Sequence, residues 1–102
     1  MARERKEVAL KRQIEGPSGQ ITKVVVQEPT AADFFALGAP QTWVRASGGM
    51  ALIDNDVAIR AYAERLIVEP DPLVAMNHMS VLDAIAVKNA IVGFFQEPPA
   101  AE

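Results

Sequence analysis

The sequence predicts an α+β fold, in which an N-terminal antiparallel β-hairpin is followed by three or four short helices. Residues 8–15 and 20–28 are short runs rich in β-branched side chains, separated by a compact turn sequence. Further along the chain, capping residues precede segments with the apolar spacing of helices. With 102 residues, half of them hydrophobic, the chain fits a single domain over residues 8–96. We expect residues 1–7 to be a basic flexible N-terminus and residues 97–102 to be a disordered tail.

The turn of the predicted hairpin is Gly16-Pro17-Ser18-Gly19. Glycine permits a positive φ, and proline fixes its own φ at a value that turns use. A hairpin on its own is only marginally stable in water, so we expect the helices to cover it.

The first predicted helix covers residues 31–37. Thr30 and Asp33 form a capping box at its start, and Gly38 and Pro40 end it. Such a short helix is unstable without tertiary packing, so it must lie against another part of the fold.

Two longer helices follow. Asp54, Asn55 and Asp56 cap a segment over residues 57–68, whose apolar side chains recur with the i, i+3, i+4 spacing of one helix face. Ser80 then opens a helix over residues 81–95 that is apolar on nearly every side. A terminal helix of this kind is either central in the fold or covered by a partner.

Two stretches carry no clear pattern. Residues 40–53 are either a short helix that stops at Gly48-Gly49 or an irregular loop with Trp43 packed beneath it. Residues 73–79 are expected to be a connector between helices, because Pro70 and Pro72 disfavour helix just before them.

Charge and composition limit the classes of partner. The net charge is −3, while residues 1–23 carry six basic and three acidic side chains. We interpret this segment as a solvated strand face, and nucleic acid as an unlikely partner, because the acidic remainder opposes phosphate binding. No apolar run approaches the ~20 residues that cross a membrane, and cysteine is absent. A cytoplasmic protein without a signal peptide or membrane contact is expected.

No residue pattern predicts catalysis, a metal or a cofactor. His78 is the only histidine, and a zinc site would need further nitrogen or sulfur ligands. Asp54 and Asp56 resemble the start of a calcium loop, but Ile59 and Arg65 occupy the positions that require glycine and glutamate. We therefore interpret His78 as a loop or cap residue and the two aspartates as helix caps, and predict that the protein is not an enzyme.

Apolar side chains in excess of the needs of so small a core are the remaining functional signal. The candidate partner-binding residues are Phe34, Phe35, Trp43, Ile91, Phe94 and Phe95. Adjacent residues on a helix point about 100° apart, so Phe34 and Phe35 cannot both enter one core. One of them is expected to plug the core between hairpin and helices, and the other to extend toward the last helix or a partner.

The order of these motifs resembles a known family. The helix start Glu28-Pro29-Thr30-Ala31-Ala32-Asp33-Phe34, the middle helix AIRAYAERLI, the segment Met79-Ser80-x-x-Asp83 and the helix end Val92-Gly93-Phe94-Phe95 are similar to the small tail assembly chaperones of Mu-like and related long-tailed phages and prophages. The resemblance covers roughly residues 8–96. The stretch around Trp43 and Gly48-Gly49 does not match the pattern.

The resemblance implies a non-enzymatic assembly factor in the cytoplasm of the bacterial host. Such chaperones bind the long helical tape measure protein, help to recruit the tail tube protein, and are absent from the mature virion. Many also exist in a longer, frameshifted form. Two alternatives stay open: a small DNA-binding regulator that uses the basic N-terminal segment, and a minor structural protein of the tail. The surplus of apolar surface also leaves self-association open.

Overall fold

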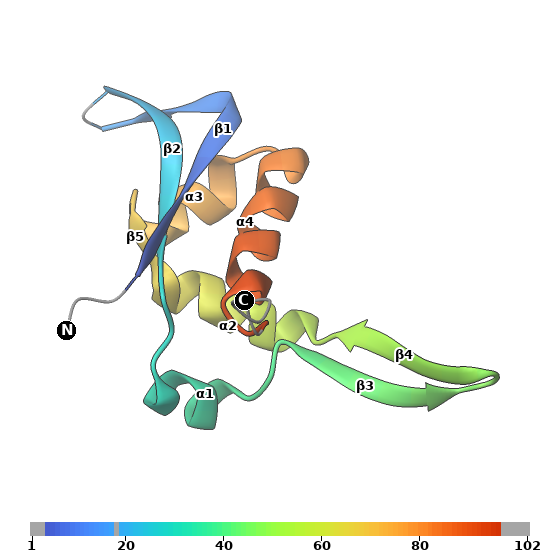
Figure 1. The fold of residues 1–102 in the computed structure, drawn as a ribbon. Coiled ribbons are helices and arrows are strands. Elements are labelled where there is room, and N and C mark those ends of the chain that lie inside the picture. The colour runs from blue at the N-terminus through green and yellow to red at the C-terminus, as the bar shows by residue number, and fades with distance from the viewer. Residues whose placement is uncertain (1–3, 18, 97–102) are drawn as a thin grey trace, which may run out of the picture.

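The computed structural model describes residues 4–17 and 19–96 and has the predicted α+β fold (Figure 1). The expectations for residues 1–3 and for the tail at 97–102 lie outside the described residues. The elements in chain order are β1 (Arg5–Gly16), β2 (Gly19–Gln27), α1 (Ala31–Leu37), β3 (Gln41–Ala46), β4 (Gly49–Asp54), α2 (Asp56–Leu66), β5 (Ile67–Glu69), α3 (Pro72–His78) and α4 (Val81–Gly93).

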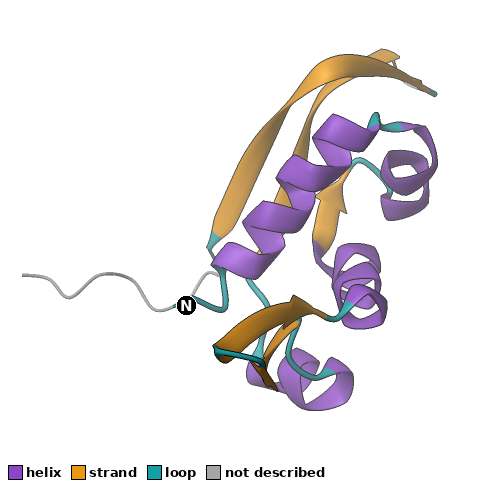
Figure 2. Cartoon of the chain, turned by 90° about the vertical axis from the view of Figure 1, so that its right-hand side faces the viewer, coloured by secondary structure: helices purple, strands orange, loops and turns teal. Residues whose placement is uncertain are grey.

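The body of the molecule is a three-stranded antiparallel sheet with helices on one face. The strand order is β1-β2-β5, and β1 and β2 pair from Arg5 with Gln27 to Gly16 with Gly19. Seen from the side, α4 runs along the sheet, and α2 and α3 lie on the same side of it (Figure 2). The predicted hairpin is thereby confirmed, and so is the expectation that helices cover it.

The core lies between this sheet and the helices. Its fully buried members include Val24 and Val26 of β2, Tyr62 and Leu66 of α2, and Ile91 of α4. Burying a side chain of this size contributes about 1.5–3 kcal/mol, so these few residues hold the sheet and the helices together.

A buried carboxylate joins the first strand to the last helix. The register of β1 against β2 shifts between Ala9 and Ile14, and this bulge frees two backbone N–H groups. The N–H of Lys11 donates to Asp83 Oδ1 at 2.8 Å, and the N–H of Arg12 donates to Asp83 Oδ2 at 3.1 Å. Ser80 Oγ donates to the same carboxylate at 2.9 Å. The hydrogen bonds, that from Lys11 above all, outweigh burial and hold the pKa of Asp83 below its usual value.

For residues 40–53 the sequence suggested a short helix or a loop over Trp43, and the structure shows neither. This stretch is a second antiparallel hairpin, β3–β4, and its register runs from Gln41 opposite Asp54 to Ala46 opposite Gly49. The turn depends on Gly48 and Gly49, whose φ angles of 86° and 149° lie in the region that favours glycine.

Three element boundaries also differ from expectation. The connector expected at 73–79 contains the helix α3, because Asp71 caps it and Pro72 stands in its first turn, where proline is tolerated. Helix α2 ends at Leu66, and the next three residues pair with β2 as β5. Strand β1 begins at Arg5, so Arg5 to Glu7 belong to the sheet and not to a flexible segment.

Candidate functional site: an apolar ribbon and groove

The hairpin β3–β4 projects from the body as a two-stranded ribbon that no other element of the described residues covers along its length (Figure 1). It exposes five large apolar side chains: Trp43, Val44, Met50, Leu52 and Ile53. Trp43, the only tryptophan of the chain, is 64% exposed. Exposed apolar clusters of this kind mark surfaces that contact other molecules.

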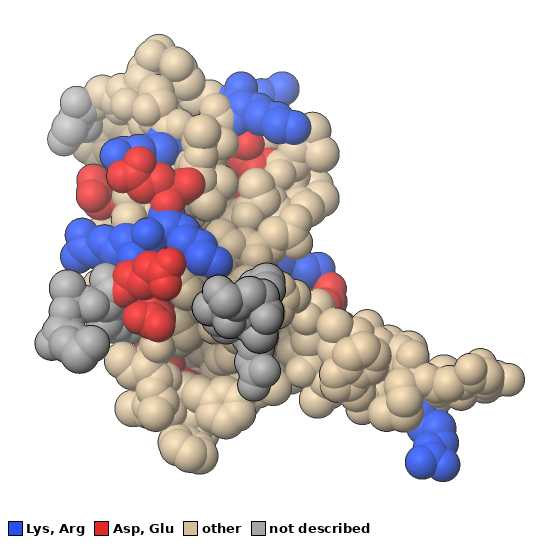
Figure 3. Space-filling model, in the orientation of Figure 1, with Lys and Arg blue, Asp and Glu red and all other residues tan. Residues whose placement is uncertain are grey.

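The two faces of the ribbon are both apolar. Trp43 lies opposite Leu52, and residues directly opposite one another in an antiparallel pair share a face. On the other face, Thr42 lies opposite Ile53 and Val44 opposite Ala51. Arg45 is the only basic residue between Gln41 and Asp54. Most of the projecting ribbon is accordingly tan in the space-filling view (Figure 3).

The base of the ribbon is fixed, while its tip is free. Asp54 accepts a hydrogen bond from Gln41 Nε2 at 2.7 Å and forms an ion pair with Lys88 of α4. The backbone N–H of Asn55 donates to the carbonyl of Pro40 at 2.8 Å. The hydrogen bonds from Lys88 and Gln41 lower the pKa of Asp54, and the same ion pair raises the pKa of Lys88. Both strands therefore leave the body from one anchored point.

A groove continues from the ribbon onto the body. It has a volume of about 430 Å³ and lies between α1, the base of the ribbon and the end of α4. Phe34, Trp43, Leu52, Val92 and Phe95 contribute its apolar lining. The groove thus unites the Trp43 face of the ribbon with apolar side chains of both α1 and the last helix.

A row of aromatic rings runs from solvent to core, and its two middle members, Phe34 and Phe95, line this groove. Phe35 and Phe34 have ring centroids 5.7 Å apart, Phe34 and Phe95 6.3 Å, and Phe95 and Tyr62 5.0 Å. Tyr62 is fully buried, and its hydroxyl donates to the carbonyl of Gly38 at 2.6 Å, at the end of α1. Burial raises the pKa of this hydroxyl. The inner end of the row is therefore fixed, and its outer end is open.

Helix α1 is held in place by polar contacts as well as by the rings. The predicted capping box is confirmed: Thr30 Oγ1 accepts from the N–H of Asp33, and the carboxylate of Asp33 accepts from the N–H of Thr30. Arg65 of α2 donates to the same carboxylate at 3.1 Å. The hydrogen bond from the Thr30 backbone, with the help of Arg65, lowers the pKa of Asp33. These contacts supply the tertiary support that so short a helix needs.

The structure brings three of the six predicted partner-binding residues together, namely Phe34, Trp43 and Phe95. Phe35 is 83% exposed beside them, at the outer edge. Phe94 instead lies under the ammonium group of Lys6, which is 4.2 Å from its ring centroid. Ile91 is fully buried, so its assignment to the partner-binding surface was wrong: the inward face of α4 belongs to the core.

The expectation that one phenylalanine of α1 plugs the main core was also wrong. Phe34 remains 41% exposed and lines the groove, because α1 lies beside the sheet–helix body and not within it (Figure 1). Sequence reasoning missed Leu52, Met50 and Ile53 as surface residues. The signal that could have found them is the Gly48-Gly49 pair between two short runs of β-capable residues, which is typical of a hairpin turn.

The remaining candidate residues do not assemble into a second site. His78 is the last residue of α3 and is exposed, while Ser80 is engaged with Asp83 and caps α4. In the described part of the chain, no three His, Cys, Asp or Glu side chains are grouped as a metal site would require. Asn55 accepts the N–H of Ala58 and is the cap of α2. The two aspartates that were also expected to be caps have other places: Asp56 lies in the first turn of α2, and Asp54 binds Gln41 and Lys88 at the base of the ribbon.

Basic and acidic side chains alternate over the β1–β2 face (Figure 3). Lys23, for example, forms an ion pair with Glu7 at 3.1 Å. Interleaved charges of both signs do not make the continuous basic surface that a nucleic-acid backbone requires. None of the helices within residues 4–17 and 19–96 is long and apolar enough to cross a membrane.

Comparisons of this chain with protein-family models, with curated proteins and with solved structures gave no match.

Proposed function

We propose that this protein is a non-enzymatic tail assembly chaperone of a phage or prophage that binds the tape measure protein. The observation that carries the proposal is the groove between α1, α4 and the ribbon, which leaves Phe34, Trp43 and Phe95 accessible on one surface. The similarity of the sequence motifs to tail assembly chaperones supports the same conclusion. Work in the cytoplasm of the bacterial host and absence from the mature virion belong to this proposal.

The groove suits one apolar face of an amphipathic helix. Apolar side chains spaced i, i+3, i+4, i+7 on such a helix would enter the groove in turn, and the Trp43 face of the ribbon would lie along the helix. The groove offers few charged groups: its polar lining comes from the amides Gln41 and Gln96 and from backbone atoms. The contact is therefore apolar and tolerant of sequence, as a chaperone for a long and repetitive helical protein needs.

This arrangement explains how the chaperone would keep its client soluble. A long helical protein that awaits assembly exposes an apolar stripe, and this stripe aggregates unless it is covered. Each chaperone covers one stretch of the stripe with side chains that are exposed in the free protein, and no covalent step is needed. Tail tube subunits displace the chaperones when they cover the same stripe in the assembling tail.

Co-expression with a tape measure protein from the same phage or prophage tests the proposal. The wild-type chain should raise the soluble fraction of the tape measure protein and co-purify with it, and Trp43→Ser should lose both effects. Val57→Ser is the matched control, because Val57 is an exposed apolar side chain on α2 away from the groove. No complex with the wild-type chain, or equal losses in both variants, would contradict the proposal. Recovery of the chain from purified particles would assign it instead to the tail structure.

A further inference from the structure

A second apolar surface lies at the other end of α4. Its apolar members are Val81, Leu82 and Ile85, whose side chains are 76%, 62% and 47% exposed. They share one side of the helix, while Asp83 and Val87 point into the body. None of the three lines the groove at the ribbon, so the proposed tape measure site leaves this surface unexplained.

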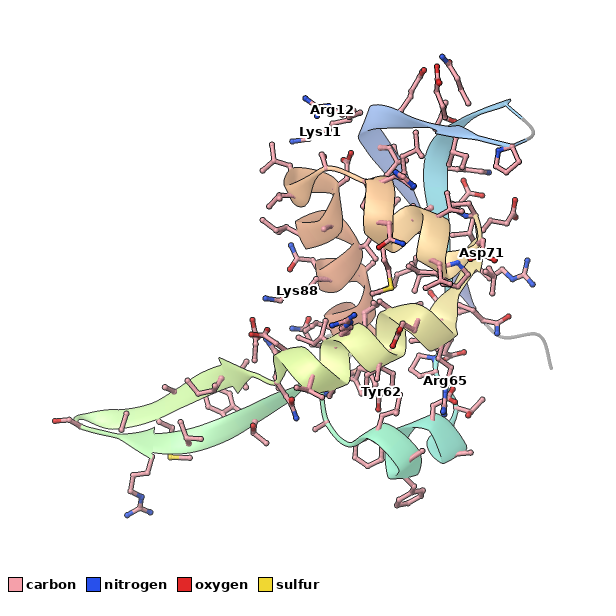
Figure 4. The ribbon with its side chains drawn as sticks, turned by 180° about the vertical axis from the view of Figure 1, so that it is seen from behind. Lys11, Arg12, Tyr62, Arg65, Asp71 and Lys88 are labelled. Carbon is pink, nitrogen blue, oxygen red and sulfur yellow. The ribbon has the colours of Figure 1, made fainter. Side chains whose placement is uncertain are left out.

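Two cations border this surface. Lys11 and Arg12 stand at the bulge of β1, beside the N-terminal end of α4 (Figure 4). Their backbone N–H groups are bound to Asp83, in the first turn of α4, so the bulge is held against the helix. Among the described residues neither side chain makes an ion pair, and both are exposed. We call Lys11, Arg12, Val81, Leu82 and Ile85 the basic apolar patch.

The same geometry excludes one mode of binding here. Strand β1 is at the edge of the sheet, and an open edge can accept a strand from another protein. At the bulge, however, the N–H groups of Lys11 and Arg12 are bound to Asp83, so they cannot pair with an incoming strand. A partner at this point must therefore pack against the side chains of α4, which is the way in which a helix docks on a helix.

The charge of the patch selects the chemistry of that helix. An apolar stripe flanked by carboxylates would place its apolar side chains on Val81, Leu82 and Ile85 and its carboxylates on Lys11 and Arg12. A membrane surface is the less favoured occupant. Two cations attract anionic lipid only weakly, at about 1 kcal/mol each, and the chain as a whole carries a charge of −3.

We propose that the basic apolar patch is a second docking site, which binds an acidic amphipathic helix of another protein. The site is separate from the groove and does not depend on the function proposed for the groove. A protein with both sites can hold two partners, or two segments of one partner, at opposite ends of α4.

Two synthetic helical peptides test this site directly. The first carries leucine at the i, i+3, i+4 and i+7 positions with glutamate on both flanks, and the second has lysine in place of each glutamate. Among the described residues, the groove has no charged side chain in its lining and would bind both peptides alike, so the difference between them reports on the patch. Fluorescence anisotropy with the complete chain should show at least about tenfold tighter binding of the acidic peptide, and this difference should shrink as salt is added. Equal affinity for the two peptides would overturn the proposal.

Charge exchange gives the sharper result. Lys11→Glu combined with Arg12→Glu should lose the acidic peptide and gain the basic one, whereas Arg45→Glu combined with Arg60→Glu makes the same change of net charge elsewhere and should alter neither affinity. The milder pair Lys11→Gln and Arg12→Gln should weaken the acidic peptide alone, and it guards against misfolding next to Asp83. An unchanged preference in both patch variants, while circular dichroism shows them folded, would sink the idea.

Two further measurements locate the peptide. Ile85→Ser should weaken its binding, and Trp43→Ser should leave it unchanged, because Trp43 belongs to the groove. Loss of binding in Trp43→Ser alone would place the peptide in the groove and overturn the second site. Wild-type binding to vesicles of anionic lipid, with no binding of the acidic peptide, would overturn it in favour of a membrane contact.

Discussion

The chain forms two antiparallel hairpins, of which one is covered by helices and the other is exposed on both faces. In β1–β2 one face is buried under α2 and α4, and the bulge of β1 is closed by the carboxylate of Asp83. In β3–β4 both faces are exposed, and the polar contacts that join it to the body within the described residues lie at its base, at Asp54 and Asn55. The first hairpin owes its stability to what covers it. The second has the same backbone pairing without a cover, so its apolar side chains remain available to a partner.

Within one small domain, the body therefore supplies the stability and the ribbon supplies the exposed apolar surface. The apolar residues of the body are buried in a core, and those of the ribbon are exposed. A two-stranded ribbon is only marginally stable in water, so its shape depends on its anchored base and on whatever it binds.

The largest effect is expected from truncation of the same residue type in the two regions. Leu66 is fully buried between β2 and the helices, and Leu52 of the ribbon is 41% exposed. Leu66→Ala should lower the free energy of unfolding by about 2–5 kcal/mol, because it removes buried methyl groups and leaves a cavity. Leu52→Ala should lower it by less than about 1 kcal/mol. Urea denaturation measures both, and comparable losses would mean that the ribbon is packed against the body.

An intermediate effect is expected from Asp83→Asn, and it should depend on pH. The pKa of Asp83 is lowered in the folded protein, so its ionised form stabilises the fold. This contribution is fully present above the pKa of the unfolded state, near about 3.9, and is lost as the pH falls through the lower folded value. The variant should melt at a lower temperature than the wild type at neutral pH, and the gap should narrow below about pH 4.

The control for this experiment is Asp33→Asn, because the pKa of Asp33 is also lowered, while its carboxylate accepts a hydrogen bond in the cap of α1 and that of Asp83 accepts two from the bulge of β1. That variant should change the fluorescence of Trp43 in the adjacent groove. Its melting temperature should fall less than that of Asp83→Asn. A gap for Asp83→Asn that is constant from neutral to acidic pH would mean that the ionised carboxylate does not support the bulge.

The smallest effect on stability is expected from removal of the ribbon itself. Gln41 and Asp54 lie opposite one another, so residues 42–53 can be replaced by Asn-Gly, a two-residue sequence that closes a hairpin. The free energy of unfolding should change by less than about 1 kcal/mol, since the ribbon shares no core with the body. Binding of the tape measure protein should be lost in the co-expression assay. A shortened chain that unfolds early, or one that still binds, would break the contrast drawn above.

The parts that the sequence predicted well are those governed by local rules. Thr30, Asn55 and Ser80 cap their helices as residues of their type do, and the first hairpin has strong turn residues between two β-branched runs. These signals act over a few residues, so they can be recognised without knowledge of the tertiary fold.

The parts that it missed depend on distant contacts. The sequence around Ile91 does not show which face of α4 is buried, because nearly every side of that helix is apolar. The ribbon was missed because both its faces are apolar, which blurs the alternation by which a half-buried strand is recognised. Strand β5 is only three residues long and directly follows a helix, so only pairing with β2 shows that it is a strand.

The carboxylate that joins β1 to α4 also has a consequence for how the chain is made. Strand β1 leaves the ribosome early, but its bulge needs Asp83, which is synthesised 71 and 72 residues later than its two backbone partners. Until then the N–H groups of Lys11 and Arg12 have only water to bind, and the edge of the new hairpin is open to pairing with other chains. During translation, the nascent chain thus depends on α4 to close the bulge of β1.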